Sequence, residues 1–214
     1  MDRLSGPATI LIVFTILAFA GCAFDPPPFD NPVDPINRDG DPPVSEYSVG
    51  DIGPAGGWIF YVDEAGDFAE WTYLEAATVD LYDEVEDIYL WDESDPHPEI
   101  GGTLTVLGSG LENTQIIVAF LGVGQYAARA ADEYEEGGFT DWFLPSLDEM
   151  EIMYANLDGA GDLVEDFGFF TSYYWTSSEI DADNAWAWNF DTNVSLDREK
   201  RTMGAFRMRP ARRF

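Results

Sequence analysis

The chain has 214 residues, of which 46% are hydrophobic and 15% aromatic, and it carries a formal net charge of −31 at pH 7. This apolar content is enough to bury a core, and it excludes disorder for most of the chain. The acidic balance argues against nucleic acid as a partner, because a phosphate backbone would be repelled and proteins that bind it normally present a basic face.

Residues 1–21 have the features of an export signal. Arg3 lies in a short amino-terminal region, and the residues from 8 to 20 are almost all apolar. This stretch is the size of a signal peptide and is shorter than the roughly 20 residues of a membrane-spanning helix. Cys22, the only cysteine of the chain, follows directly after small residues.

This arrangement resembles the bacterial lipoprotein signal, in which the cysteine is diacylated and becomes the first residue of the mature chain. The resemblance implies a protein anchored to a bacterial membrane through lipid such as palmitate on Cys22, and not one that spans it. The alternative is an incidental cysteine in an ordinary secreted protein. Without a second cysteine the domain cannot form an internal disulfide, so it depends on its core.

Residues 22–46 form a predicted tether. The stretch after the cysteine is rich in proline and aspartate and has almost no periodic apolar pattern. Segments of this kind are extended and semi-stiff, reaching about 3 Å per residue. We therefore expect a lipid-anchored protein of the cell envelope, at the outer membrane or cell surface, with one domain over residues 47–214.

Strands are predicted at both ends of this domain. The aromatic and β-branched run 58–62 predicts a strand, and residues 71–74 are its expected hairpin partner. In the second half, alternation of Trp186, Trp188 and Phe190 with smaller residues predicts a strand with one heavily buried face. A sugar-stacking aromatic platform is the alternative for these three rings. Further strands are expected at 173–176 and 205–209.

Helical spacing of apolar residues fills the middle of the domain. It predicts helices over 113–121 and over 127–134. Ser146 and Glu149 then have the spacing of a capping box before an apolar stripe, which predicts a helix start and a structural role for the glutamate. His97, the only histidine, lies between two prolines and is expected in an exposed loop.

Seven of the ten basic residues lie at the carboxyl-terminal end of the chain. Two interpretations stay open: a terminal strand laid against an acidic neighbour, or a site for an anionic ligand. The seven are Arg198, Lys200, Arg201, Arg207, Arg209, Arg212 and Arg213.

The sequence gives no positive sign of catalysis, and we expect no enzyme. One cysteine at a lipidation motif and one proline-flanked histidine leave almost no room for a Cys-His or Ser-His-Asp nucleophile. There is no glycine-rich phosphate loop with a lysine and no zinc ligand set. Paired carboxylates can hydrolyse glycosides, but among 41 acidic residues no pair stands out.

Residues 138–150, Gly-Phe-Thr-Asp-Trp-Phe-Leu-Pro-Ser-Leu-Asp-Glu-Met, resemble the Lcl C-terminal domain family of bacterial envelope and adhesin proteins. Segments at 174–179, 185–190 and 209–214 agree with the family in the same order, whereas Phe143 stands where many members have arginine. The resemblance implies an α+β, C-type-lectin-like fold. In that fold two helices pack on a small twisted antiparallel sheet, the first and last strands are adjacent, and the loops are long.

The family resemblance also implies recognition of a ligand. Its best-known member is similar to an adhesin for sulfated polysaccharides, but the acidic balance here argues against that ligand. We expect a ligand-recognition or adhesion module for a glycan or a partner protein, and a homo-oligomer is compatible with the sequence. A structural envelope lipoprotein and a glycan-active enzyme are the alternatives.

Ligand contacts are expected from loop residues, because recognition usually sits on loops held by a rigid scaffold. The candidates are Trp175, Ser177, Glu179, Asp183 and Asn184. We expect no cofactor. Calcium suits the clustered oxygen ligands of this loop and stays an alternative to a solvated turn.

Overall fold

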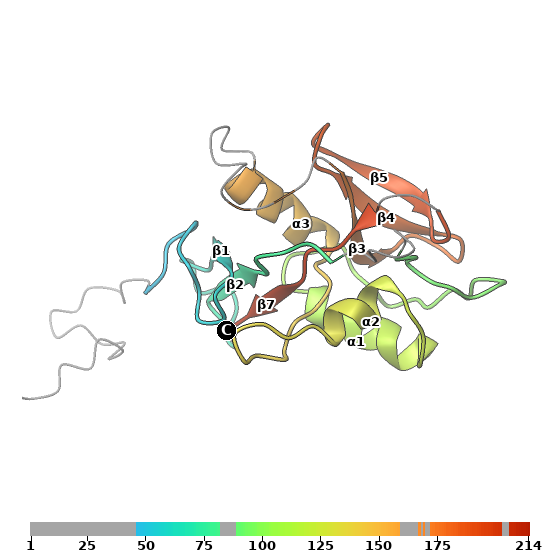
Figure 1. Ribbon diagram of the computed structural model, residues 1–214, viewed down its shortest axis with the longest axis horizontal. Helices are drawn as coiled ribbons and strands as arrows, with labels where there is room; N and C mark the ends of the chain where they lie inside the picture. The colour runs from blue at the N-terminus through green and yellow to red at the C-terminus, as the bar shows by residue number, and fades with distance from the viewer. Residues whose placement is uncertain (1–45, 82–88, 159–166, 168, 170–171, 203–205) are drawn as a thin grey trace, which may run out of the picture. The chain divides into compact units, whose positions relative to one another are not determined.

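The computed structural model describes residues 46–81, 89–158, 167, 169, 172–202 and 206–214. The chain divides into two compact units, residues 1–44 and residues 45–214. The predicted signal, Cys22 and nearly all of the predicted tether lie outside the described residues. In the second unit, the described residues form an α+β domain with three α-helices and two β-sheets (Figure 1).

The first sheet joins the two ends of the domain. Strand β1 (Trp58–Val62) pairs antiparallel with β2 (Tyr73–Ala76), and β2 pairs antiparallel with β7 (Ala211–Arg213). The predicted hairpin is confirmed, although its second strand begins at Tyr73. The last strand lies next to β2, so the expectation that it lies directly beside the first strand is wrong.

The second sheet has the strand order β5-β4-β3-β6. Its members are β3 (Tyr173–Glu179), β4 (Asn184–Asn189), β5 (Val194–Glu199) and β6 (Phe206–Arg207). Strand β6 runs parallel to β3 and is separated from β7 only by residues 208–210, so it links the two sheets. The expectation of one small antiparallel sheet is therefore wrong in two respects, since there are two sheets and one pairing is parallel.

The helices cover both faces of the second sheet. Helices α1 (Gly110–Leu121) and α2 (Ala127–Asp132) pack together, with α1 against β3, while α3 (Leu147–Met153) packs against β3 and β4 from the other side (Figure 1). Helix α3 continues into a π-helical turn, η1 (Tyr154–Asp158). The resemblance implied two helices, whereas the described part of the domain has three.

The capping box predicted at the start of α3 is confirmed. The hydroxyl of Ser146 accepts the backbone N–H of Glu149, and the Glu149 carboxylate accepts the backbone N–H of Ser146. Both side chains are fully buried. The reciprocal bonds satisfy two donors that the first turn of a helix would otherwise leave without a partner.

Strand β4 is buried on both faces. Trp188 and Phe190 pack in one core cluster with α3, and Ala185 and Ala187 pack in another with α1 and α2. The prediction of a core face is therefore confirmed for Trp188 and Phe190, which leaves no exposed platform there. Trp186 is half-buried.

The basic residues at the carboxyl-terminal end pair with buried acids. Arg212 lies opposite Glu75 in the register of β7 and β2, 3.3 Å from its carboxylate, and Arg209 lies 2.6 Å from Asp80. Burial raises the pKa of both carboxyls, and the two guanidinium groups act in the opposite direction. The sequence left two interpretations open for the basic residues, a terminal strand laid against an acidic neighbour or a site for an anionic ligand. For Arg209 and Arg212 the structure agrees with the first.

Replacement of Trp142 by alanine tests the core. The Trp142 side chain is 1% exposed, packs edge-on against Tyr134 and donates from Nε1 to the Phe139 carbonyl. Loss of this ring should lower the free energy of unfolding by about 3 to 5 kcal/mol, measured by denaturant titration. Val123→Ala, at a site 98% exposed, should change it by less than about 0.5 kcal/mol. Equal stability of the two variants would contradict the core assignment.

Candidate functional site

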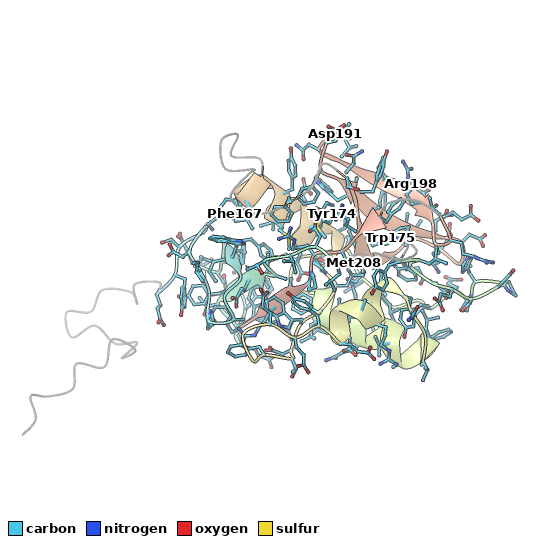
Figure 2. The ribbon with its side chains drawn as sticks, in the orientation of Figure 1. Phe167, Tyr174, Trp175, Asp191, Arg198 and Met208 are labelled. Carbon is cyan, nitrogen blue, oxygen red and sulfur yellow. The ribbon has the colours of Figure 1, made fainter. Side chains whose placement is uncertain are left out.

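Two of the five predicted ligand residues are fully buried. Trp175 stacks on Phe206, and its Nε1 donates to the Tyr89 carbonyl at 2.9 Å. Figure 2 shows Trp175 near Met208, with which it shares a core cluster. Ser177 accepts a hydrogen bond from the Asn113 amide inside the domain. In this conformation neither side chain has surface for a ligand.

Glu179 is held inside the domain by its own contacts. Its carboxylate lies 2.6 Å from Nζ of the buried Lys200 and accepts the backbone N–H groups of Ile100 and Gly101. Only 4% of the Glu179 side chain is exposed. The pair therefore fastens the loop at 100–101 to the second sheet, and its carboxylate is already occupied.

Asp183 lies in the exposed turn between β3 and β4, and the half-buried Asn184 is the first residue of β4. The turn is closed by Asp181, whose carboxylate accepts the side-chain amide of Asn184 and the backbone N–H groups of Asp183 and Asn184. These hydrogen bonds hold the pKa of the Asp181 carboxyl below its ordinary value, and the bond from the Asn184 side chain has the largest effect. The five predicted residues thus do not form one site. Within the described ranges, no group of three or more histidine, cysteine or acidic residues is placed to hold a metal ion.

His97 is not the exposed residue that its flanking prolines predicted. Its side chain is 7% exposed, and its Nδ1 lies 3.4 Å from the buried carboxylate of Asp92. Nζ of Lys200 donates to the neighbouring Pro98 carbonyl at 3.3 Å. This long-range contact folds the loop onto the domain, which the local sequence could not indicate.

A groove of about 420 Å³ lies between the loop at 67–71, the segment at 102–109 and the start of α1. Phe68 is half-buried in it and stacks on Trp71 with ring centroids 4.1 Å apart. No sequence pattern singled out Phe68, and Trp71 was placed in the expected strand 71–74, whereas β2 begins at Tyr73 and Trp71 precedes it. The groove is the candidate functional site.

Gly108 and Asp63 fix the aromatic pair. The backbone of Gly108 has φ +87°, and an added Cβ would lie 2.9 Å from Phe68 and 3.2 Å from Trp71. Only glycine combines this conformation with so close an approach. The buried carboxylate of Asp63 accepts the backbone N–H groups of Asp67 and Phe68, which sets the course of the loop that carries the ring.

Glu149 supports the wall of the groove. Besides its bond to Ser146, its carboxylate accepts the backbone N–H groups of Gly108 at 3.0 Å and Gly110 at 3.4 Å. Burial raises its pKa from 4.5 to about 7, while the backbone N–H donors act in the opposite direction. One carboxylate therefore ties the start of α3 to the start of α1.

The polar groups around the groove are mostly committed to each other. Arg213 pairs with Glu112 at 2.8 Å and donates to the Gly108 carbonyl. The Asn113 side chain exchanges hydrogen bonds with the backbone of Leu104. The exposed carboxylates of Asp67 and Glu70 and the side chains of Leu104 and Val106 remain open to a ligand; the two apolar chains are 56% and 51% exposed. The site therefore offers apolar surface and hydrogen-bond acceptors.

Comparison with models of known protein families finds no match for this chain, and comparison with curated protein sequences finds none either. Within the described part of the chain, no helix has the length and apolar character needed to cross a membrane.

Replacing Glu149 with glutamine should change how stability depends on pH. The folded-state pKa lies above the unfolded one, so between pH 4.5 and about 7 the native state holds a proton that the unfolded state releases. Wild-type stability from this group is therefore full near pH 4.5 and falls as the pH rises to 7, by on the order of 3 kcal/mol.

Glutamine does not titrate, so the difference between the two proteins isolates this one carboxyl from all others. Denaturant titrations at several pH values should show the wild type losing stability relative to Glu149→Gln from pH 5 to pH 8. Parallel curves would mean that this carboxyl titrates alike in both states.

Proposed function

We propose that the protein is a lipid-anchored, extracytoplasmic lipoprotein of the cell envelope whose domain is a ligand-recognition or adhesion module. We further propose that the domain has the C-type-lectin-like fold of the Lcl C-terminal family. The α+β architecture and the order of the similar segments along the chain support this fold. In these terms residues 22–46 are a tether that holds the module away from the membrane.

The observation that carries the proposal is the aromatic pair of the groove. The half-buried ring of Phe68 is held in place because it stacks on the buried ring of Trp71, and because Gly108 has no side chain that would collide with either ring. The surrounding loops are held by the buried carboxylates of Asp63 and Glu149. Concave sites with apolar walls and a few fixed polar groups are typical of ligand binding.

Substitution of Cys22 tests the membrane anchor. The mature protein should begin at a diacylated Cys22, whereas Cys22→Ser should keep its signal and carry no lipid. Intact-mass spectrometry of both proteins measures the added lipid. An unmodified cysteine or an uncleaved wild-type signal would contradict the anchor.

Removal of the Phe68 ring tests the recognition site. The purified full-length protein is screened against a glycan array and a displayed peptide library, at two salt concentrations and with or without calcium. Phe68→Ala should weaken any specific ligand by about tenfold or more, as expected for a central aromatic contact.

Tyr173→Ala is the matched control, because Tyr173 is a 36% exposed, ring-stacked aromatic on β3, outside the groove. This variant should bind like the wild type, and both variants should melt at similar temperatures. No ligand in either screen, or equal loss in both variants, would contradict the proposed site. Turnover of a glycan would contradict a purely binding role.

A further inference from the structure

The groove continues onto the exposed face of α1. Glu112 lines the groove, and Ile116 and Phe120 follow it at intervals of four residues on the same side of the helix. An added Cβ at Gly102, another lining residue, would lie 3.8 Å from Cδ1 of Ile116, which places the end of the groove beside this stripe. Phe120 is 52% exposed.

Together these residues form one surface, here named the apolar track. It consists of Phe68, Leu104 and Val106 in the groove and Ile116 and Phe120 on α1. The α1 part alone rises about 12 Å from Glu112 to Phe120, at about 1.5 Å per residue. A track of this length suits an extended polymer segment better than a single small molecule.

The charges beside the track are negative. Asp67 and Glu70 are exposed at its aromatic end, and neither carboxylate forms a hydrogen bond or an ion pair with another residue that the structure describes. Arg213, the one guanidinium among the described residues that line the groove, is paired with Glu112. The site thus presents acceptors and negative charge next to apolar side chains.

This composition selects among ligand classes. A neutral glycan needs donors as well as acceptors in its site, but the Asn113 amide already uses both of its donors within the domain, and Arg213 is paired with Glu112. A second copy of the chain, or its own acidic segment at 22–46, brings like charge to an acidic rim. A segment with positive charges on one side and apolar side chains on the other matches both features.

We infer that the apolar track binds a cationic amphipathic polypeptide segment, with its apolar face on the track and its lysines or arginines beside Asp67 and Glu70. This inference rests on the proposed function and names the ligand class of the same site. The mode resembles the binding of an amphipathic helix in a groove, where apolar side chains anchor and charges orient the partner.

Binding of synthetic peptides to the full-length protein at physiological ionic strength tests the inference. The ligand is a peptide of leucine and lysine at helical spacing. A lysine and serine peptide of equal charge controls for attraction to a protein of charge −31, and a leucine and glutamate peptide controls for apolar contact. The leucine and lysine peptide should bind at least about tenfold more tightly than either control peptide.

Two pairs of variants locate the contact. Asp67→Asn with Glu70→Gln should weaken this peptide about tenfold, whereas Asp183→Asn with Glu199→Gln, which removes the same charge from exposed sites on the second sheet, should change binding less than about twofold. Ile116→Ala with Phe120→Ala should also weaken it about tenfold. Val79→Ala with Ile180→Ala, at exposed sites off the track, should have no effect.

The possible results separate this inference from the proposed function. Equal binding of the two lysine peptides, or equal loss in the two charge variants, would mean that the net negative charge of the whole protein explains the binding. Either result would overturn the inference. Phe68-dependent binding of a neutral glycan without binding of the leucine and lysine peptide would overturn it while leaving the recognition function in place. Failure of every ligand would overturn both.

Discussion

Buried carboxylates that bind loop backbone hold this domain together. Irregular loops expose N–H groups that need acceptors once the loop packs against a core. Among the described residues, four buried carboxylates each accept hydrogen bonds from two or more backbone N–H groups. These carboxylates belong to Asp63, Glu75, Glu149 and Glu179. Each donor left unsatisfied would cost about 1 to 3 kcal/mol. A chain with one cysteine thus organises its loops by charge where many small domains use disulfides.

The few basic residues compensate part of this buried charge. Arg212 lies beside Glu75, Lys200 beside Glu179, and Arg209 beside a further buried acid, Asp80. Loss of one partner from a buried pair costs about 3 to 5 kcal/mol, because the other charge stays buried and uncompensated. Two of these pairs join the strand β7 region to the first half of the domain. The termini of the fold are therefore closed by ion pairs as well as by strand pairing.

Local features of the fold were predictable from the sequence, and long-range ones were not. The capping box needs only Ser146 and Glu149 three residues apart, and a run of β-branched and aromatic residues marks β1. The further bonds of Glu149 to residues 108 and 110 depend on how distant segments pack. Trp175 and Ser177 looked like loop candidates, but β3 is an inner strand of its sheet and helices cover both faces. Their burial follows from that position, which no local pattern encodes.

The charge distribution of the surface attracts positively charged molecules in general but does not distinguish one from another. Because bases such as Arg209, Arg212 and Lys200 are buried in ion pairs, the outer surface keeps most of the negative charge. At physiological ionic strength such a field is screened within about 8 Å, so it draws in cations of every kind without distinguishing among them. Discrimination must then come from short-range contacts with apolar surface that water leaves on binding. In this domain the groove presents exposed aromatic and aliphatic side chains directly beside the exposed carboxylates of Asp67 and Glu70.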